Sequence, residues 1–250
     1  MDSEGAFPPS GADDREVGPL PARPPDRSPS NTSLAPTLID LPVDGVRLLP
    51  AFPPGTLTLA VPTDDVLVVA GLPGAGKSTL LRGSTGPDDV VLDPQLLSDR
   101  LRTVLPGVPY GLLRPAVHLA HRIRVLTALS RGTQNLIIHE PGGRYLWRRR
   151  LVWFARMRGR TVHLLVVLAE PATAEAGRIR RARTLPAHWA MRHEREWERL
   201  RSELTRGWTG STLAGEGFTG CTFLPRSAVP AVVSLRAPVH EGPVGGVRST

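Results

Sequence analysis

The sequence predicts an α/β protein built on a mainly parallel, doubly wound sheet. From residue 65 onward, short apolar runs alternate with longer segments of helical period. Strands that alternate with helices indicate parallel βαβ units. The chain has 250 residues, of which 40% are hydrophobic. It is therefore long enough to bury both faces of such a sheet.

Five short apolar segments are expected to form the strands of this sheet. The segment 66–70 is apolar at every position, as in a strand that is buried on both faces. The segment 57–61 precedes the alternating pattern, so it is predicted to be a small edge strand that leads into the domain. The five sheet strands are expected at residues 66–70, 90–92, 135–138, 162–168 and 221–224.

Helices are expected at residues 77–82, 94–105, 114–130, 145–158, 172–183 and 188–205. In the segment 145–158, Leu151, Phe154 and Ala155 share one helical face, so they are predicted to be core residues. The run of three arginines at 148–150 is expected to coat the opposite, solvated side.

Composition divides the chain into four segments. Residues 1–36 contain eight prolines with Ser, Gly and Asp between them and show no period, so they are expected to be a disordered tail. Residues 37–64 are interpreted as a lead-in segment, 65–225 as the α/β domain, and 226–250 as a C-terminal extension.

Charge is unevenly distributed along the chain. The net charge is +8, but residues 1–100 carry 14 acidic and 7 basic residues, whereas 101–200 carry 6 and 19. A basic half attracts phosphates or nucleic acid, or it consists of arginines on solvated helix faces; the sequence leaves both readings open. Only one of the 31 basic residues is a lysine, Lys77. A compact ammonium on a flexible stem reaches between phosphates as a planar guanidinium does not.

No feature of the sequence indicates export or a membrane. The N-terminus, Met1-Asp2-Ser3-Glu4, is acidic because of Asp2 and Glu4, and it lacks the basic and apolar regions of a signal peptide. No apolar run approaches the ~18 residues that span a bilayer. The single cysteine, Cys221, is interpreted as a small apolar residue in a strand. A cytoplasmic protein without a membrane partner is therefore expected.

One motif carries specific chemistry, the phosphate-binding loop or P-loop G-x-x-x-x-G-K-[ST]. It follows the strand 66–70 and opens the helix 77–82, which is the context that the motif requires. Glycines let successive N–H groups turn toward phosphates, and the helix N-terminus adds partial positive charge. Lys77 is expected to reach the β- and γ-phosphates, and the Ser78 hydroxyl to ligate Mg²⁺. The residues predicted to bind nucleotide are Gly71, Leu72, Pro73, Gly74, Ala75, Gly76, Lys77, Ser78 and Thr79.

Two acidic residues follow neighbouring strands and are candidates for the rest of the site. Asp93 comes directly after the strand 90–92, where it is expected to position or deprotonate an acceptor hydroxyl. Its alternative role is an N-cap, because Pro94 follows it. Glu140 is the candidate partner of Mg²⁺ after the third strand. It stands one place late, because His139 occupies the position where an acidic residue is expected.

Four arginines near the end of the helix 172–183 are candidates to stabilise transferring charge. They are Arg178, Arg180, Arg181 and Arg183, and the predicted catalytic pair is Arg181 and Arg183. The alternative is a solvated basic face.

With these residues in place, the segment from about 66 to 204 resembles the P-loop kinase-like AAA-domain ATP-binding proteins. These proteins are relatives of polynucleotide-kinase and zeta-toxin-type kinases. The resemblance rests on the loop phrase from Gly71 to Leu80, on Asp93 before a helix, and on the fourth strand and its arginine helix. The arginine-rich composition resembles actinobacterial members. The resemblance implies a three-layer P-loop NTPase fold, five strands in the order 2-3-1-4-5, and transfer of the ATP γ-phosphate to a hydroxyl. Many relatives carry Asp where this chain has His139.

The first functional hypothesis is therefore an ATP- and Mg²⁺-dependent kinase acting on a small molecule or a polynucleotide end. The alternative is a nucleotide-binding regulatory protein with weak or no phosphotransfer, which the departure at His139 favours. A nucleic-acid partner is a further hypothesis, and only the basic charge of residues 101–200 supports it.

Overall fold

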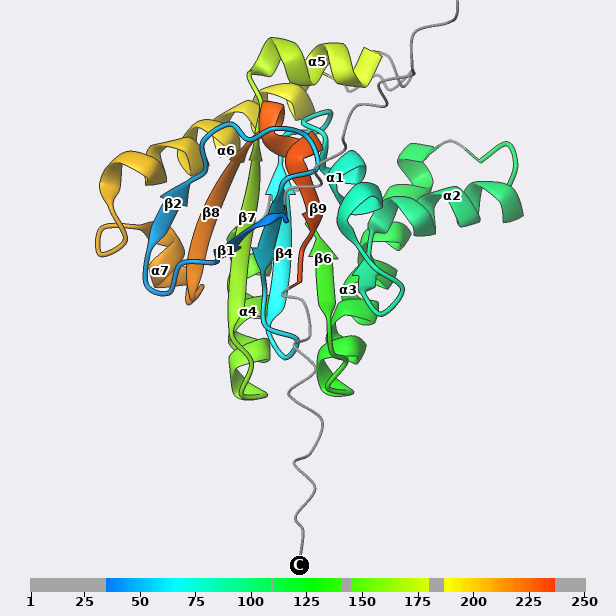
Figure 1. Cartoon of the computed structure of the whole chain (residues 1–250). Helices are drawn as coiled ribbons and strands as arrows, with labels where there is room; N and C mark the ends of the chain where they lie inside the picture. Colours follow the sequence, from blue (N-terminus) through cyan, green and yellow to red (C-terminus); the bar gives the residue numbers. More distant parts are fainter. Residues whose placement is uncertain (1–34, 109, 141–144, 180–186, 237–250) are drawn as a thin grey trace, which may run out of the picture. The chain divides into compact units, whose positions relative to one another are not determined.

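Six parallel strands form the main sheet of this computed structural model, which describes residues 35–108, 110–140, 145–179 and 187–236 (Figure 1). The order from β5 to β8 is the predicted 2-3-1-4-5 order, which is thereby confirmed. The expected number of strands is one too low, because β2 joins beside β8. In spatial order the strands are β2 (Val46–Leu48), β8 (Gly220–Pro225), β7 (Val162–Leu168), β4 (Val66–Gly71), β6 (Leu136–His139) and β5 (Val90–Leu92).

The added strand β2 covers the edge of the sheet at β8. Val46 pairs with Cys221, and the amide of Leu49 just beyond the strand donates to the carbonyl of Phe223 at 2.9 Å. An edge strand exposes unpaired backbone groups, and this pairing satisfies those of β8. Residues 46–48 are too few to show a period, so local sequence does not predict a strand there.

A second, three-stranded parallel sheet consists of β1 (Thr37–Asp40), β3 (Leu57–Ala60) and β9 (Val232–Ser234). The predicted strand at 57–61 exists, but its assignment to an edge is wrong. It lies between β1 and β9, and all four of its residues are buried. Its second neighbour comes from the far end of the chain, which local sequence does not reveal.

The predicted helices are all found within a few residues of their expected bounds, as far as they lie in the described ranges. Residues 180–183 of the fifth lie outside those ranges. In Figure 1, α3 and α4 lie behind the main sheet, whereas α1 and the second sheet lie in front of it. The helices are α1 (Lys77–Ser84), α2 (Pro94–Val104), α3 (Tyr110–Ser130), α4 (Tyr145–Met157), α5 (Pro171–Ile179), α6 (Ala187–Arg206) and α7 (Thr212–Glu216), followed by the 3₁₀ helix η1 (Arg226–Ala231).

The arginine run of α4 does not lie entirely on the solvated side, as the sequence predicted. Arg149 and Arg150 are exposed, but Arg148 is buried. Its guanidinium forms two hydrogen bonds of 2.9 Å with the carboxylate of Glu216 at the end of α7. The buried face of α4 therefore includes the charged Arg148 side chain. It can be buried because Glu216 of α7 supplies the opposite charge.

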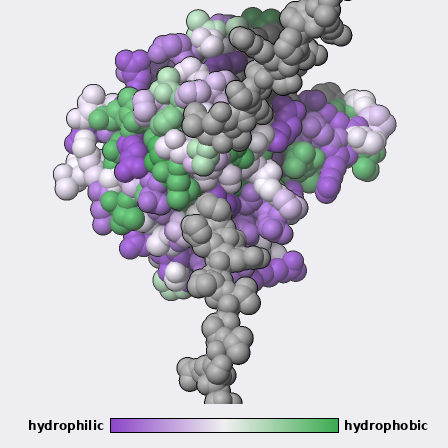
Figure 2. All heavy atoms as spheres, viewed as in Figure 1, coloured by the Kyte–Doolittle hydropathy of each residue, from purple (hydrophilic) through white to green (hydrophobic). Residues whose placement is uncertain are grey.

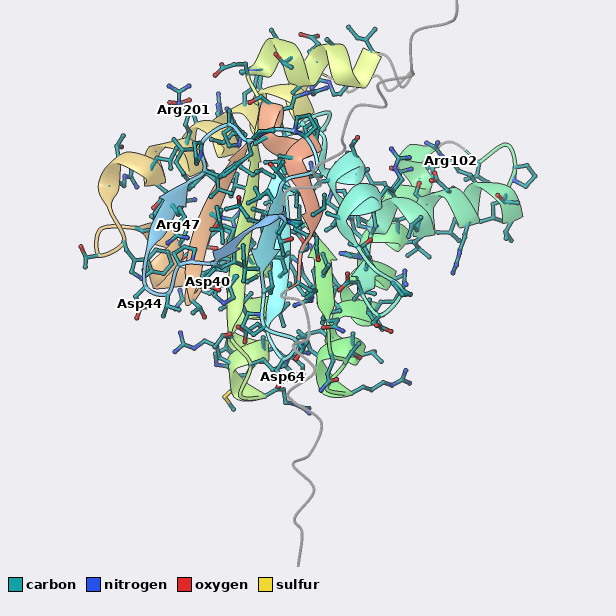
Figure 3. All side chains as sticks on the ribbon, in the orientation of Figure 1. Asp40, Asp44, Arg47, Asp64, Arg102 and Arg201 are labelled. Atoms are coloured by element: carbon teal, nitrogen blue, oxygen red, sulfur yellow. The ribbon has the colours of Figure 1, made fainter. Side chains whose placement is uncertain are left out.

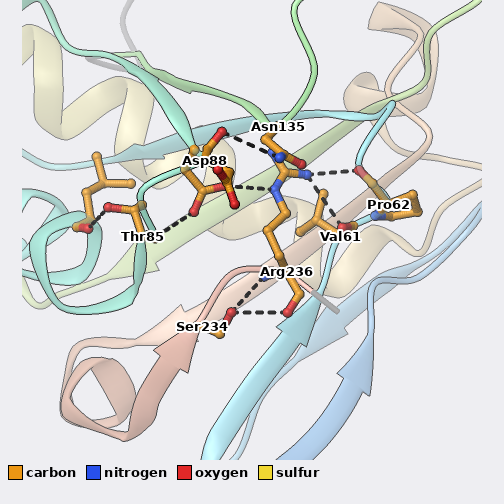
Figure 4. Close-up of polar contacts among 10 residues, drawn as sticks. Val61, Pro62, Thr85, Asp88, Asn135, Ser234 and Arg236 are labelled. Carbon is orange, nitrogen blue, oxygen red and sulfur yellow. Dashed lines mark hydrogen bonds and ion pairs between the residues drawn. The ribbon is translucent and has the colours of Figure 1, made fainter. Parts of the chain in front are cut away.

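Arg236 fixes the chain just after β9 (Figure 4). Its Nε donates to Asp89 Oδ1 at 3.2 Å, and its Nη1 donates to the carbonyl of Pro62 at 2.9 Å. The Ser234 hydroxyl donates to the carbonyl of Arg236 and accepts from the amide of the same residue, at 3.1 Å each. Segments near residues 62, 89 and 236 are thereby joined at the end of the sheet opposite the glycine-rich loop.

The surface carries basic residues on several elements. Figure 3 shows Arg102 on α2 and Arg201 on α6 on different sides of the described residues. Arg47 on β2 is also exposed, and its Nη1 donates to the carbonyl of Asp40 at 2.7 Å. Figure 2 shows green, hydrophobic areas on the α2 side. The apolar residues Leu96 and Val104 of α2 are exposed. None of the helices in the described ranges has both the length and the apolar character needed to cross a membrane.

Candidate functional site

The segment between β4 and α1 is a tight loop whose backbone requires glycine. Gly71, Gly74 and Gly76 have φ angles of 139°, 93° and 110°, in the left-handed region that favours this residue. A Cβ atom at Gly71 would lie 2.6 Å from the carbonyl oxygen of Val167 in β7. The loop therefore packs closely against β7, and its backbone conformation requires residues without a side chain at these three positions.

The first turn of α1 presents backbone donors to this loop. Its N-cap is Gly76, and no side chain caps it. A helix N-terminus without a side-chain cap carries amides and a partial positive charge that suit an anion. The loop and this turn together fit the phosphates of a nucleotide.

Lys77 is the first residue of α1, and its side chain folds back onto the loop and does not extend into solvent. It is 6% exposed, and its Nζ donates to the carbonyls of Gly71 at 2.8 Å and of Leu72 at 2.9 Å. These carbonyls hold the ammonium against the loop. The contact of Lys77 with the β- and γ-phosphates stays a prediction.

Asp93 and His139 meet because of strand register. Leu92 of β5 pairs with Ile138 of β6, so the next residues of the two parallel strands are neighbours. His139 Nδ1 lies 2.9 Å from Asp93 Oδ1, and the two side chains are only 12% and 11% exposed. The same carboxylate oxygen accepts from the amide of Gln95 at 2.8 Å, so Asp93 also caps α2. The N-cap role suggested by the sequence is therefore present, whereas the role of Asp93 toward an acceptor hydroxyl stays a prediction.

The charge of Asp93 is stabilised in this position. Burial alone raises the pKa of Asp93, but the contact with His139 and the Gln95 amide outweigh burial and lower that pKa overall. The carboxylate is therefore ionised at neutral pH. It is better suited to orient a hydroxyl than to remove its proton early.

Glu140 follows β6 and turns toward α4. Its amide donates to the carbonyl of Val69 at 3.0 Å, and its Oε2 accepts from Trp147 Nε1 at 3.0 Å. Arg122 lies over the Trp147 ring, 5.0 Å from its centroid. The carboxylate is 5% exposed and is held by helix α4. Its association with Mg²⁺ stays a prediction.

A family model described as an AAA domain matches residues 66–206, more than half of the chain. The chain belongs to the AAA domain family. This assignment confirms the resemblance inferred from the loop and its surroundings. The matched region contains the glycine-rich loop, Asp93, His139 and α5.

Solved structures similar to this AAA domain have low sequence identity. A candidate kinase from Chloroflexus aurantiacus is 16% identical, with a TM-score of 0.48, and the match covers 67% of this chain and 88% of that one. A chain from the PezAT toxin–antitoxin system of Streptococcus pneumoniae is 17% identical, with a TM-score of 0.40 and coverages of 49% and 54%. The tunicamycin resistance protein of Deinococcus radiodurans is 20% identical, with a TM-score of 0.35 and coverages of 55% and 79%. No curated protein gives a significant match.

In this AAA domain, α5 and Arg226 contact the glycine-rich loop at Gly74. Arg226 Nη1 donates to the carbonyl of Gly74 at 2.6 Å and lies 3.4 Å from that of Thr173. A Cβ atom at Gly177 of α5 would lie 2.5 Å from the carbonyl oxygen of Gly74. The backbone of α5 therefore packs directly against the backbone of the loop. Sequence reasoning missed both residues, because no motif signals a contact between such distant positions; Arg226 and Gly74 are 152 positions apart.

Only one of the four arginines that are candidates to stabilise transferring charge lies within the described residues. Arg178 lies on α5, and its Nη2 is 3.6 Å from Glu175 Oε1. Arg180 and the predicted catalytic pair Arg181 and Arg183 lie outside the described residues. Within the described ranges of this AAA domain, no group of three or more His, Cys, Asp and Glu is arranged to hold a metal.

The contact between α5 and the loop gives a testable difference between two helix glycines. Alanine forms helices better than glycine by roughly 1 kcal/mol, so Gly83→Ala in α1, with open space around it, should stabilise the fold. Gly177→Ala should instead weaken nucleotide affinity by roughly tenfold, about 1.4 kcal/mol, because its methyl group displaces Gly74. Calorimetry with ATP and thermal unfolding measure both effects. Equal ATP affinity in the Gly177→Ala and Gly83→Ala variants would show that the α5 contact does not shape the loop.

Proposed function

We propose that this AAA domain is an ATP-dependent kinase that transfers the γ-phosphate to a hydroxyl of a small molecule or a polynucleotide end. The observation that carries the proposal is the placement of Asp93. A fixed, ionised carboxylate stands at the carboxyl edge of the sheet, on the side where β4 enters the loop. Ligands of open α/β sheets bind at this edge.

The loop supplies the nucleotide part of the proposed site. Magnesium-bound ATP supplies the transferable phosphoryl group and the metal that neutralises its charge. The loop amides and Lys77 hold the phosphates, and the Ser78 hydroxyl is the proposed metal ligand, with Glu140 acting through water. Arg226 and α5 fix the loop from outside, so the donors need little rearrangement when phosphate binds.

Asp93 supplies the acceptor part. It accepts a hydrogen bond from the acceptor hydroxyl and orients the oxygen toward the phosphorus. His139 and the Gln95 amide keep the carboxylate in place. Since phosphoryl transfer proceeds through a loose transition state, orientation contributes more than early proton removal.

The proposal is tested by direct transfer. The full chain is incubated with magnesium and radiolabelled ATP in the presence of neutral polyols, sugar phosphates and 5′-hydroxyl oligonucleotides. A kinase labels one acceptor class faster than it releases free phosphate. Label that appears only as free phosphate, or not at all, contradicts the proposal.

Removing the single lysine should abolish tight nucleotide binding. Lys77→Ala is expected to weaken magnesium–ATP affinity by about tenfold or more, because it removes the charged contact to the β- and γ-phosphates. Isothermal calorimetry measures the change. Arg82→Ala is the matched control, since Arg82 is an exposed cation of the same helix whose Nε donates to the Ser78 carbonyl at 3.1 Å. Equal losses in the two variants would remove Lys77 from the nucleotide site.

A second candidate function is a nucleotide-dependent regulatory protein with little transfer. The observation that favours it is that polar groups predicted to bind ATP and Mg²⁺ form hydrogen bonds within the protein. Lys77 bonds the loop carbonyls, Glu140 bonds Trp147, and a histidine stands where an acidic residue is expected. Tight magnesium–ATP binding without transfer to any acceptor supports this function over the kinase.

A further inference from the structure

Helix α4 presents an apolar stripe to solvent. Its inner side packs against β7 and includes the buried residues Leu151 and Val152. Leu146, Trp153 and Met157 lie on the opposite side and are 67%, 61% and 66% exposed. Their spacing of seven and then four residues places them on one line along the helix. Tryptophan is highly buried on average, so one that is more than half exposed at the centre of such a stripe points to an interaction surface.

Arginines border this stripe on both sides. Arg149 and Arg150 follow Leu146 by three and four residues, and at 3.6 residues per turn these two positions fall on opposite flanks of the stripe. Arg156 extends the flank that Arg149 begins, and all three arginines are exposed. The outward side of α4 thus combines leucine, tryptophan and methionine with guanidinium groups on either side of them.

The neighbouring helix α3 has a similar exposed stripe. Leu112, Leu119 and Ile123 have the same spacing of seven and four residues, and each is more than half exposed. Helices α3 and α4 pack against each other, and both lie behind the main sheet in Figure 1. Since the buried side of each helix meets a strand of that sheet, both stripes face away from it. The exposed sides of the two helices are together called the α3–α4 face.

The charges of the α3–α4 face are all positive. Helix α3 contains three arginines and α4 contains four, and neither helix contains Asp or Glu. The only acidic residue of the sequence between positions 101 and 160 is Glu140, which is buried and bonded to Trp147. A surface of this kind attracts acidic partners and repels a second copy of itself.

We propose that the α3–α4 face binds an acidic amphipathic helix of a protein partner. The apolar side of that helix packs on Trp153 and the leucines, and carboxylates beside it pair with Arg149 and Arg150. Helices that dock on an apolar surface are anchored at every third or fourth residue, which matches the spacing of the two stripes. Tryptophan and arginine are also the residues that most often dominate the binding energy of protein interfaces.

Other classes of partner satisfy less of the α3–α4 face. A second copy would set arginines against arginines. Nucleic acid pairs with guanidinium groups but leaves the leucines without an apolar contact. A bilayer accepts apolar residues, but Arg149 and Arg150 lie in the same exposed arc as Trp153 and would be drawn toward the hydrocarbon with it. An acidic amphipathic helix satisfies both the stripe and its flanks.

Binding is measured by fluorescence anisotropy with the full chain and labelled helical peptides. The test peptides carry leucine or phenylalanine at positions i, i+4, i+7 and i+11 and glutamate at the flanking positions. Peptides with lysine in place of glutamate, and peptides of the same composition in scrambled order, are the controls. Vesicles of phosphatidylserine with phosphatidylcholine and a DNA duplex represent the other two classes. We expect a saturable complex with the glutamate peptides alone.

Two variants locate the complex on α4. Trp153→Ser, and separately Arg149→Gln combined with Arg150→Gln, should each weaken affinity for the glutamate peptides by roughly tenfold or more. Met191→Ser and Arg195→Gln, at exposed positions of α6, are the matched controls and should retain affinity. Because every substituted side chain is exposed, the variants should fold and bind magnesium–ATP like the wild type.

Each outcome supports or overturns the proposal. Peptide binding that both α4 variants weaken supports it. No binding by any peptide, or equal binding of the glutamate and lysine peptides, overturns it. Binding of vesicles or DNA without binding of the peptides overturns the protein class of the partner. Peptide binding that Trp153→Ser leaves unchanged overturns the assignment to this face. If a variant does not fold, hydrogen exchange on the wild-type complex decides, since residues 146–157 must then exchange more slowly with peptide than without it.

Discussion

Asp93→Asn is expected to lower phosphoryl transfer to the acceptor by roughly 10²-fold or more, the usual scale for a positioned acid–base group. Asparagine keeps the size of the side chain and caps a helix about as well as aspartate, so the bond to the Gln95 amide survives. The negative charge that orients the acceptor hydroxyl is lost. Magnesium–ATP affinity should hold, because the loop and Lys77 are untouched.

The matched control for this substitution is Asp99→Asn. Asp99 is an exposed carboxylate of the same helix, and its Oδ1 accepts from the Gln95 side chain at 2.6 Å. Single-turnover transfer and thermal unfolding are measured on both variants. Wild-type transfer by Asp93→Asn would exclude Asp93 from the mechanism. A large loss of stability, with transfer falling in proportion, would make the residue structural.

Breaking the buried ion pair of Arg148 and Glu216 should cost about 3–5 kcal/mol of unfolding free energy in either single variant, Arg148→Met or Glu216→Leu. The side chains are only 2% and 0% exposed, and two hydrogen bonds of 2.9 Å join them. Removal of one partner leaves an uncompensated charge inside the protein. Urea denaturation followed by circular dichroism measures the loss.

The double variant Arg148→Met with Glu216→Leu distinguishes charge from packing. It removes both charges and keeps apolar volume, so it should recover most of the stability that each single variant loses. Arg149→Met and Arg150→Met are controls on the exposed side of α4 and should change the unfolding free energy by no more than ~0.5 kcal/mol. Additive losses in the double variant would show that the two side chains do not act as a pair.

Much of the fold could be predicted because its signals are short in range. The apolar run 66–70 predicted a strand buried on both faces, and every residue of β4 is buried. The spacing of glycines with Lys77 predicted the turn into α1, since a loop of this length has few backbone conformations. The strand order came from the resemblance, and the six-stranded sheet agrees with it.

The sequence alone determined the phosphate-binding loop, the alternation of strands and helices, and the candidacy of Asp93. Tertiary structure decided which distant residues meet. It set His139 beside Asp93 by strand register, Arg226 on the Gly74 carbonyl, and Glu216 on Arg148. The physical reason is that periodicity and turn chemistry act over a few residues. The partner of a buried polar group is instead chosen by packing and strand pairing across the whole chain.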